Sequence, residues 1–323
     1  MKVLDLFSGV GGFRFGMEAA GHETVGWVER DKFARRAYQA IHQPRGEWTH
    51  EDIRTIDYME LPRTDIWTFG FPCQDISVAG KQTGFKGNRS SLFFATTKLL
   101  RQLKERHTDE LPTYLVIENV KNFLSVNGGW DFLLAQIELD EIGYDCEWQL
   151  LNSSNFRVPQ NRERVFIVGH LRGRSRGKVF PITGESATTS LQQINGPAAD
   201  AFRVYNANGL ARTLKAEAGG GGAKTGLYLV GNVNPSGNGM NGQVYDSKGL
   251  APTITTNKGE GPKIKDGYRI RKLTPLETFR LQAFPDWAFY RAKEAGTSDS
   301  QLYKQAGNSV TTTVVYEIAK RLK

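Results

Sequence analysis

The chain has 323 residues and a net charge of +8, with 24% charged and 39% hydrophobic residues, two cysteines and five histidines. This size and balance are typical of a soluble folded protein, built as one large domain with an insertion or as two domains. Two cysteines cannot form a disulfide framework, and no Cys/His spacing suggests zinc. No apolar run is long enough to span a membrane, and the N-terminus has no signal-peptide layout. We therefore expect a cytoplasmic protein without a metal and without a membrane partner.

Short apolar runs alternate with helical patterns over residues 1–170. We predict strands over residues 3–7, 24–29, 66–69, 114–118 and 165–169, and helices over residues 13–20, 32–41, 92–105 and 130–142. This alternation predicts an α/β fold, with a Rossmann-like, mostly parallel sheet that carries helices on both faces. Ligands of such sheets bind at the carboxyl ends of the strands.

The composition changes after His170. Residues 171–270 contain 18 of the 35 glycines, many Asn, Thr and Ser residues, and little helical periodicity, which is typical of loops and short strands. They hold 13 Lys/Arg against 6 Asp/Glu, a surplus of 7 that accounts for nearly all of the net charge. A local basic surplus of this kind indicates a polyanionic partner such as nucleic acid.

Part of this region is a near-repeat with an offset of 40 residues. Val204-Tyr205 with Gly209-Leu-Ala211 returns as Val244-Tyr245 with Gly249-Leu-Ala251, which predicts two similar hairpin-like units. Regular patterns resume with a predicted helix over residues 274–282, capped by Thr274, and the chain ends in a predicted helix over residues 311–322.

A glycine-rich turn, Asp5-Leu-Phe-Ser-Gly-Val-Gly-Gly12, joins the first strand to the first helix. Glycines there let the backbone approach a ligand at the helix N-terminus. Glu29 ends the second strand, where it can accept bonds from ribose hydroxyls, and Asp52 could bond an adenine amino group. Together they predict an adenosine-containing cofactor, and the spacing of glycines 9, 11 and 12 disfavours a nicotinamide dinucleotide.

Pro72-Cys73-Gln74 directly follows the predicted strand over residues 66–69. A cysteine at a strand end has the placement of a nucleophile, although a free cysteine can equally be a small buried hydrophobe. Cys146 lies between Asp145 and Glu147, and neighbouring carboxylates would raise its pKa and leave it inert. The polar, glycine-punctuated stretch from Ser77 to Ser91 is longer than most strand–helix connections, and loops of this length are usually disordered or functional. The functional interpretation is a lid that closes over the substrate.

Further candidate side chains stand at strand ends. Glu118 ends the strand over residues 114–118, at the edge where Cys73 is expected. Arg162 and Arg164 precede the strand over residues 165–169 and alternate with Glu163, so an extended chain turns both to one face. Gly307-Asn308-Ser309-Val310, before the last helix, reads by itself as an ordinary capping loop.

These blocks, in this order, closely resemble the DNA (cytosine-5)-methyltransferases of bacterial and phage restriction-modification systems, over residues 1–170 and 271–323. The resemblance implies an S-adenosylmethionine-dependent fold with a large catalytic domain, residues 1–171 and 271–323, and a β- and loop-rich target-recognition domain, residues 172–270. It implies four catalytic residues, Cys73, Glu118, Arg162 and Arg164. It places nine residues at the cofactor: Phe7, Gly9, Gly11, Glu29, Asp52, Pro72, Leu92, Asn308 and Ser309.

The implied reaction explains these residue types. The thiolate of Cys73 adds to C6 of a cytosine, which makes C5 nucleophilic. Glu118, protonated at that moment, would bond N3, Arg164 would hold the O2 edge, and Arg162 would help to position the loop. The cytosine must be flipped out of the duplex, with Gln74 and Ser77 bracing the vacated stack. S-adenosylhomocysteine is the product of the cofactor, and no metal is expected.

The remaining DNA-contact candidates lie in the lid and in the two repeats. They are Lys81, Arg89, Arg212, Lys215, Thr255, Asn257 and Lys258. Two residues depart from the family pattern: Arg30 replaces a bulky apolar residue that packs on adenine, and Ala79 replaces a hydroxyl residue that contacts phosphate. The partner is therefore expected to be double-stranded DNA, the protein a monomer, and any cognate endonuclease a separate protein.

Three alternatives remain open at this point. A tRNA cytosine methyltransferase shares the fold, although the dedicated recognition region favours DNA. A catalytically silent DNA-binding protein would not need intact Pro-Cys-Gln, Glu-Asn-Val and Gln-x-Arg-x-Arg elements. A dehydrogenase has no use for Cys73.

Overall fold

A computed structural model describes residues 1–71, 91–106, 108–175, 177–184, 229–232, 243–246, 263–266 and 269–323. The chain divides into two compact units. Unit 1 comprises residues Met1–Leu151, Glu163–Thr183 and Val314–Lys323, and unit 2 comprises Asn152–Arg162 and Gly184–Thr313. Residues 273–313 thus cluster with unit 2, whereas the sequence prediction assigns them to the large catalytic domain. The predicted domain boundaries remain a prediction.

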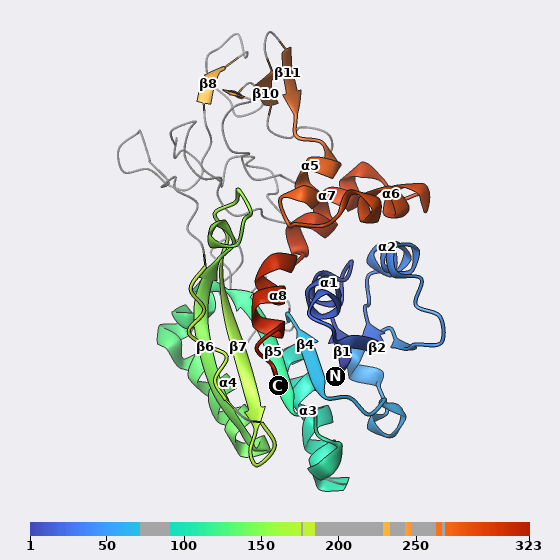
Figure 1. Ribbon diagram of the computed structural model, residues 1–323, viewed down its shortest axis with the longest axis vertical. Helices are drawn as coiled ribbons and strands as arrows, with labels where there is room; N and C mark the ends of the chain where they lie inside the picture. The colour runs from blue at the N-terminus through green and yellow to red at the C-terminus, as the bar shows by residue number, and fades with distance from the viewer. Residues whose placement is uncertain are drawn as a thin grey trace. The chain divides into compact units, whose positions relative to one another are not determined.

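Unit 1 is built on a seven-stranded sheet (Figure 1). Its strands, in spatial order, are β3 (Trp48–His50), β2 (Glu23–Val28), β1 (Lys2–Leu6), β4 (Ile66–Phe69), β5 (Tyr114–Val120), β7 (Glu163–Leu171) and β6 (Tyr144–Asn152). The pairs from β3 to β5 are all parallel, and β7 runs antiparallel to β5. The α/β, mostly parallel sheet predicted from the sequence is confirmed.

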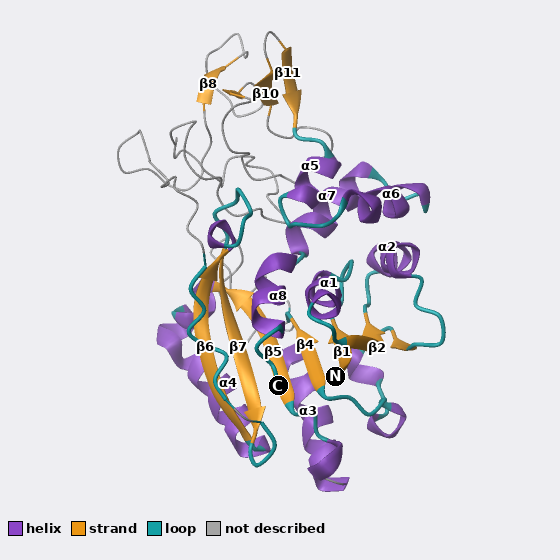
Figure 2. Cartoon of the chain, viewed as in Figure 1, coloured by secondary structure: helices purple, strands orange, loops and turns teal. Residues whose placement is uncertain are grey.

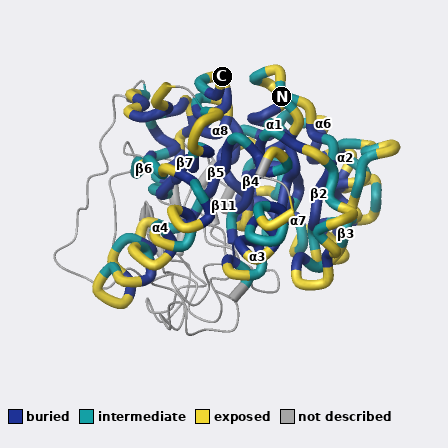
Figure 3. Tube along the Cα trace, turned by 90° about the horizontal axis from the view of Figure 1, so that it is seen from below, coloured by how far each residue is buried: buried dark blue, intermediate teal, exposed yellow. Residues whose placement is uncertain are grey.

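Helices cover both faces of this sheet, as predicted (Figures 2 and 3). The helices α1 (Gly12–Ala19) and α8 (Thr312–Ala319) lie on one face, and α3 (Ser91–Arg106) and α4 (Trp130–Ile142) lie on the other. The helix α2 (Lys32–His42) connects β2 to β3. Short 3-10 turns complete the unit: η1 (Ile53–Thr55), η2 (Tyr58–Glu60), η4 (Thr108–Glu110), η5 (Lys121–Leu124) and η6 (Val126–Gly129).

The central strands supply the core of unit 1. All four residues of β4 are buried, and Leu4, Leu6, Leu115 and Ile117 are fully buried beside them. A strand that is covered on both faces needs apolar residues at consecutive positions, which is why these runs show no alternation in the sequence. Each such side chain contributes about 1.5–3 kcal/mol through its removal from water, so the core holds the strand ends in fixed positions.

The order of the strands creates a switch point between β1 and β4. From β1 the chain proceeds to β2 and β3 on one side, and it then returns to β4 and β5 on the other. Connections leave in opposite directions at such a point and leave a crevice at the carboxyl ends of the two strands. The glycine turn and the segment that leads to Cys73 begin at these two ends.

The described residues of unit 2 form a four-stranded sheet and the helices α5, α6 and α7. The strands lie in the order β11 (Arg269–Lys272), β10 (Lys263–Asp266), β9 (Gln243–Asp246) and β8 (Leu229–Asn232). The helices are α5 (Pro275–Arg280), α6 (Asp286–Glu294) and α7 (Asp299–Asn308), and η7 (Ser153–Asn155) is a 3-10 turn. The predicted capping box is confirmed, because the Thr274 hydroxyl accepts the Glu277 N–H and the Glu277 carboxylate accepts the Thr274 N–H.

Among the described elements, the sequence prediction had no helix or strand at β3, β6, α6 and α7, and it gave no bounds for the short strands β8 to β11. β3 has only three residues, and β6 is an edge strand with few fully buried positions, so neither presents an apolar run. α7 has a polar sequence, DSQLYKQAGN, and it ends at Asn308. The motif at residues 307–310 is therefore the end of a helix as well as the approach to α8.

Candidate active site

The predicted convergence of strand ends on one edge of the sheet is confirmed in unit 1. The register pairs Leu6 with Phe69 and Phe69 with Ile117, so the residues that follow β1 and β4 adjoin Glu118. In the antiparallel pair, Val120 lies opposite Arg164, so the start of β7 is at the same edge.

The glycine turn adopts left-handed backbone conformations. Phe7, Gly9 and Gly11 have positive φ angles of 54°, 56° and 90°. The Gly11 N–H donates to the Ser8 carbonyl at 2.8 Å, and α1 begins at the next residue without a side-chain cap among the described residues. The first N–H groups of α1 are thus left for a ligand, which the turn lets approach closely.

Glu29 directly follows β2 and reaches the glycine turn, and its predicted bonds to ribose hydroxyls remain a prediction. Its Oε2 accepts the Gly9 N–H at 2.8 Å, and its Oε1 accepts the Asp31 N–H at 2.7 Å. Burial raises the pKa of this carboxyl group. Each carboxylate oxygen keeps a lone pair after accepting one bond, so Glu29 can accept further hydroxyl donors.

Asp52 lies after β3 and caps η1. The Arg54 guanidinium donates to both of its oxygens, and the Arg30 Nε lies 3.6 Å from Oδ2. The hydrogen bonds from Arg54 hold the pKa of Asp52 at about 2, so this side chain is an ionised acceptor at neutral pH. The predicted bond from Asp52 to an adenine amino group remains a prediction.

Asp5, at the end of β1, is an ionisable residue to which the sequence analysis gave no role. It is fully buried, its Oδ1 accepts the Thr68 hydroxyl at 2.9 Å, and its Oδ2 has no partner among the described residues. Burial raises the pKa of Asp5 from 3.8 to about 7. The folded protein therefore retains a proton on Asp5 between about pH 4 and pH 7, where the unfolded chain has lost it.

Stability should consequently fall as the pH rises through this range, because the native state binds more protons than the unfolded state. Relative to Asp5→Asn, wild type should lose about 2–3 kcal/mol of unfolding free energy between pH 5 and pH 8. Urea unfolding at several pH values measures this difference. The control Asp286→Asn should leave the dependence unchanged, because Arg280 lowers the pKa of Asp286 and that group titrates below this window. Parallel curves for wild type and Asp5→Asn would contradict the assignment.

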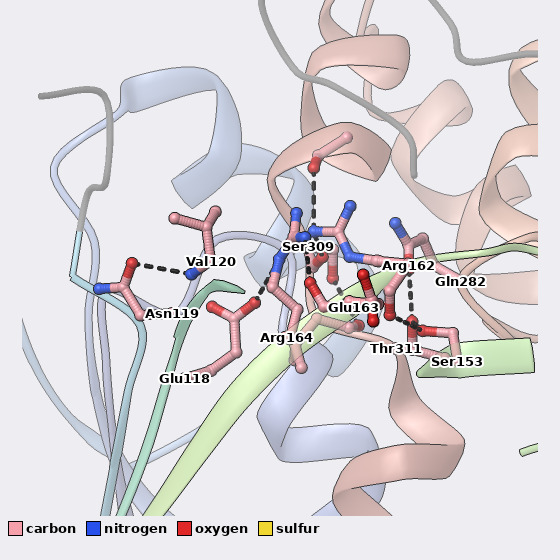
Figure 4. A network of polar contacts seen from close by, with 12 residues as sticks. Glu118, Asn119, Val120, Ser153, Arg162, Glu163, Arg164, Gln282, Ser309 and Thr311 are labelled. Atoms are coloured by element: carbon pink, nitrogen blue, oxygen red, sulfur yellow. Dashed lines mark hydrogen bonds and ion pairs between the residues drawn. The ribbon is translucent and has the colours of Figure 1, made fainter. Parts of the chain in front are cut away.

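An ion pair joins Glu118 and Arg164 at the edge of the sheet (Figure 4). The Arg164 Nε lies 2.9 Å from Glu118 Oε1, and both side chains are mostly buried, with exposures of 13% and 16%. A second Arg164 nitrogen donates to the Glu163 carbonyl at 2.8 Å. On the other side of the carboxylate, a Cβ at Gly70 would lie only 3.1 Å from Glu118 Oε2, so the backbone of residue 70 approaches it closely.

Asn119 is a buried polar residue to which the sequence analysis gave no role. It is 1% exposed, and its Oδ1 accepts the Val120 N–H at 2.8 Å. Its Nδ2 has no partner among the described residues. An unsatisfied buried donor costs about 1–3 kcal/mol, so we expect a partner for this Nδ2 beyond the described residues. The only signal in the sequence is its position next to Glu118.

Arg162 belongs to unit 2 and holds a turn of the backbone there. Its guanidinium donates to the carbonyl oxygens of Ser309 at 2.7 Å and Gly307 at 3.3 Å, and the residue is 3% exposed. Asn308 is exposed between them, and Ser309 is buried. Arg162 and Arg164 thus bind separate partners, each within its own unit, and Arg162 fixes the turn that ends α7.

The other described residues of the predicted site are nonpolar. Phe7 and Leu92 are partly buried and pack against the hydrophobic core of unit 1.

Cys146 lies on β6, and burial together with Asp145 and Asp140 raises its pKa to about 12, which agrees with its predicted inertness. Within the described ranges, no cluster of His, Cys, Asp and Glu could hold a metal ion, and no helix is long and apolar enough to cross a membrane.

Several predicted residues lie outside the described part of the chain. They are Pro72, Cys73, Gln74, Ser77, Ala79, Lys81, Arg89, Arg212, Lys215, Thr255, Asn257 and Lys258. Their roles remain predictions.

Comparison with known proteins gives consistent similarities. A model of the family "C-5 cytosine-specific DNA methylase" matches residues 1–323. The chain is 33% identical over 435 residues to the orphan methyltransferase M.SPRI of Bacillus phage SPR, with 100% of this chain and 97% of the relative covered. It is 31% identical over 324 residues to the type II methyltransferase M.HhaI of Haemophilus parahaemolyticus, with 99% and 93% covered.

Solved structures share the fold. The Entamoeba histolytica methyltransferase EhMeth superposes with a TM-score of 0.65 at 16% identity, covering 98% of this chain and 96% of that one. The Dnmt2 methyltransferase of S. pombe superposes with a TM-score of 0.63 at 18% identity, covering 99% and 97%.

Proposed function

The chain belongs to the family of C-5 cytosine-specific DNA methylases and is a DNA cytosine-5 methyltransferase, and we propose the following roles for its residues in that reaction. The observation that carries the proposal is the Glu118–Arg164 ion pair, which lies at the carboxyl end of β5 beside Gly70. In the sequence, Gly70 and Phe71 lead directly into Pro72-Cys73.

The cofactor we propose is S-adenosylmethionine, which supplies a methyl group on a sulfonium when it is bound. The residues of the glycine turn fit this molecule, because a Cβ at Gly9 would meet nothing within 4 Å and the turn therefore borders open space. Glu29 offers oxygens to ribose hydroxyls, and the uncapped start of α1 offers N–H groups. Phe7, Gly11, Asp52, Pro72, Leu92, Asn308 and Ser309 complete the proposed set.

Cys73 begins the reaction by adding its thiolate to C6 of a flipped-out cytosine. Glu118 must take up a proton before this step, and as a carboxylic acid it donates that proton to N3 of the ring, which stabilises the enamine and makes C5 nucleophilic. Arg164, held by Glu118 and by the Glu163 carbonyl, presents its guanidinium to the O2 edge. Arg162 acts indirectly, through the turn at residues 307–309. C5 would then take the methyl group that bound S-adenosylmethionine supplies, and loss of the C5 proton to a base would finally release the Cys73 thiolate by elimination.

The experiment that tests this function compares substrates. The protein, incubated with S-adenosylmethionine carrying a labelled methyl group, should transfer label to duplex DNA, and nucleoside analysis should find it in 5-methyldeoxycytidine. Transfer to tRNA alone, or to the amino group of adenine or cytosine, would overturn the proposal. We also propose that the protein acts as a monomer and that any cognate endonuclease is a separate protein. The molar mass of the complex on a single duplex site tests this, and it should equal that of one chain plus the DNA.

We further propose that residues 172–270 read the DNA sequence, through the two repeats with an offset of 40. Arg212 and Lys215 in the first repeat, and Thr255, Asn257 and Lys258 in the second, are the side chains that would reach base edges or phosphates. Gln74, Ser77, Lys81 and Arg89 would contact the DNA around the flipped base.

Replacing both Arg212 and Lys215 with alanine should weaken DNA binding roughly tenfold or more, or relax the site choice. Sequencing of methylated cytosines in cellular DNA measures the site choice, and the salt dependence of binding measures lost phosphate contacts. Unchanged methylation of the natural site, with unchanged affinity, would leave the repeats with a structural role only.

A further inference from the structure

His42, the last residue of α2, lies against the glycine turn. Its Nε2 is 3.0 Å from the Val10 carbonyl oxygen, which can only accept, so Nε2 carries the hydrogen of this bond. A Cβ on Gly11 would come within 2.1 Å of the same nitrogen. The imidazole therefore touches the backbone of the turn, 32 residues away in the sequence.

The position of the imidazole is set by its own packing. Its ring centroid lies 4.5 Å from that of Tyr38 and 4.9 Å from that of Phe15. Tyr38 is fully buried, stacks on Trp27 with a centroid distance of 4.4 Å, and accepts a hydrogen bond from Arg14 at 3.2 Å. Tyr38 lies on α2 together with His42, so its ring fixes the imidazole independently of the turn, and His42 can impose a conformation on the turn.

The turn needs such a restraint. Gly9 and Gly11 both have positive φ angles, and glycine can leave this region at little cost, so the peptide groups between them can rotate. Glu29 fixes the Gly9 N–H, and the Ser8 carbonyl fixes the Gly11 N–H. The bond from His42 adds a restraint on a carbonyl, at the peptide that joins Val10 to Gly11.

We propose that His42 is a positioning residue for the cofactor: its Nε2–H holds the Val10–Gly11 peptide in the orientation that S-adenosylmethionine meets. This inference rests on the proposed cofactor. A preorganised turn binds its ligand without first being ordered. His42 therefore acts on the binding of the cofactor and leaves the chemical steps at Cys73 and Glu118 unchanged.

The variant His42→Phe tests the proposal, because it keeps a ring against Tyr38 and Phe15 and removes the donor. Calorimetry should show a Kd for S-adenosylhomocysteine that is roughly five- to tenfold higher, as expected for an unmade hydrogen bond to a buried carbonyl. The KM for S-adenosylmethionine should rise by the same factor, with kcat within twofold of wild type. His42→Gln, whose amide can donate, should recover most of the affinity.

His22→Phe is the matched control. His22 makes the same kind of bond, from Nε2 to the Ala319 carbonyl at 3.0 Å, but away from the turn. Its loss should lower the melting temperature without a change in affinity for S-adenosylhomocysteine. Wild-type affinity in His42→Phe, or a fall in kcat with an unchanged KM, would overturn the proposal. A wild-type protein that binds no S-adenosylhomocysteine would instead refute the proposed cofactor.

Discussion

A Cys73→Ser variant is expected to lose methyl transfer by a factor of about 10⁴ or more, because a serine hydroxyl is far weaker than a thiolate as a nucleophile at neutral pH. DNA that contains 5-fluorocytosine tests the covalent bond to Cys73 directly. With fluorine in place of the C5 hydrogen, no proton can be removed from C5, so elimination is blocked and the enzyme stays covalently bound at C6. Wild type, with S-adenosylmethionine, should form a covalent complex visible on a denaturing gel, and Cys73→Ser should form none.

Cys146 provides the control for this experiment. Its burial and the carboxylates of Asp145 and Asp140 raise its pKa to about 12, so almost no thiolate exists at neutral pH. Cys146→Ser should therefore trap and methylate like wild type. If trapping persists in Cys73→Ser and disappears in Cys146→Ser, the nucleophile is Cys146 and the proposed role of Cys73 is wrong. A wild-type enzyme that methylates its site but never traps would rule out covalent catalysis.

A Glu118→Gln variant is expected to lower kcat by roughly 10²- to 10³-fold. The amide can form a hydrogen bond to N3 of the cytosine, but it cannot transfer a proton, so the negative charge that develops in the ring is not neutralised. The change also replaces the ion pair with Arg164 by a weaker neutral hydrogen bond, since the amide oxygen can still accept from Nε. Single-turnover methylation measures the loss, and covalent trapping should slow in proportion, because the affected step is the addition of Cys73.

Glu163→Gln is the matched control, since it makes the same chemical change 45 positions further along the chain. The Glu163 carboxylate pairs with Lys121 at 3.0 Å, while Arg164 uses only the Glu163 backbone carbonyl. An exposed pair of this kind contributes about 0–1 kcal/mol to stability, so activity should stay within about twofold of wild type. Equal losses of activity in Glu118→Gln and Glu163→Gln would show that the loss of a negative charge, and not the loss of a proton donor, lowers kcat.

Regular elements with a strong local pattern were predictable. The structure has β4 at residues 66–69 and α4 at residues 130–142, the predicted bounds, because an apolar run or a helical pattern ends there at clear breaks. Where local signals were weak, the prediction failed. β6 is an edge strand with partly buried positions, and α7 is polar, so their formation depends on neighbours supplied by the tertiary structure.

The sequence by itself determined the chemical groups of the site: the glycine turn, Glu29, Glu118 and the two arginines stand at strand ends, and strand ends of a parallel sheet share one edge. The tertiary structure alone decided which groups meet. Arg164 pairs with Glu118, and not with the adjacent Glu163 carboxylate, because the antiparallel register places the start of β7 beside the end of β5.

The same holds for residues that act across long sequence separations. Arg162 binds carbonyls 145 and 147 positions away, and His42 binds one 32 positions away. Backbone carbonyls are identical at every residue, so no sequence pattern marks them as partners. Their hydrogen bonds exist because packing fixes both the arginine or imidazole and the turn, and that fixation is a property of the folded chain alone.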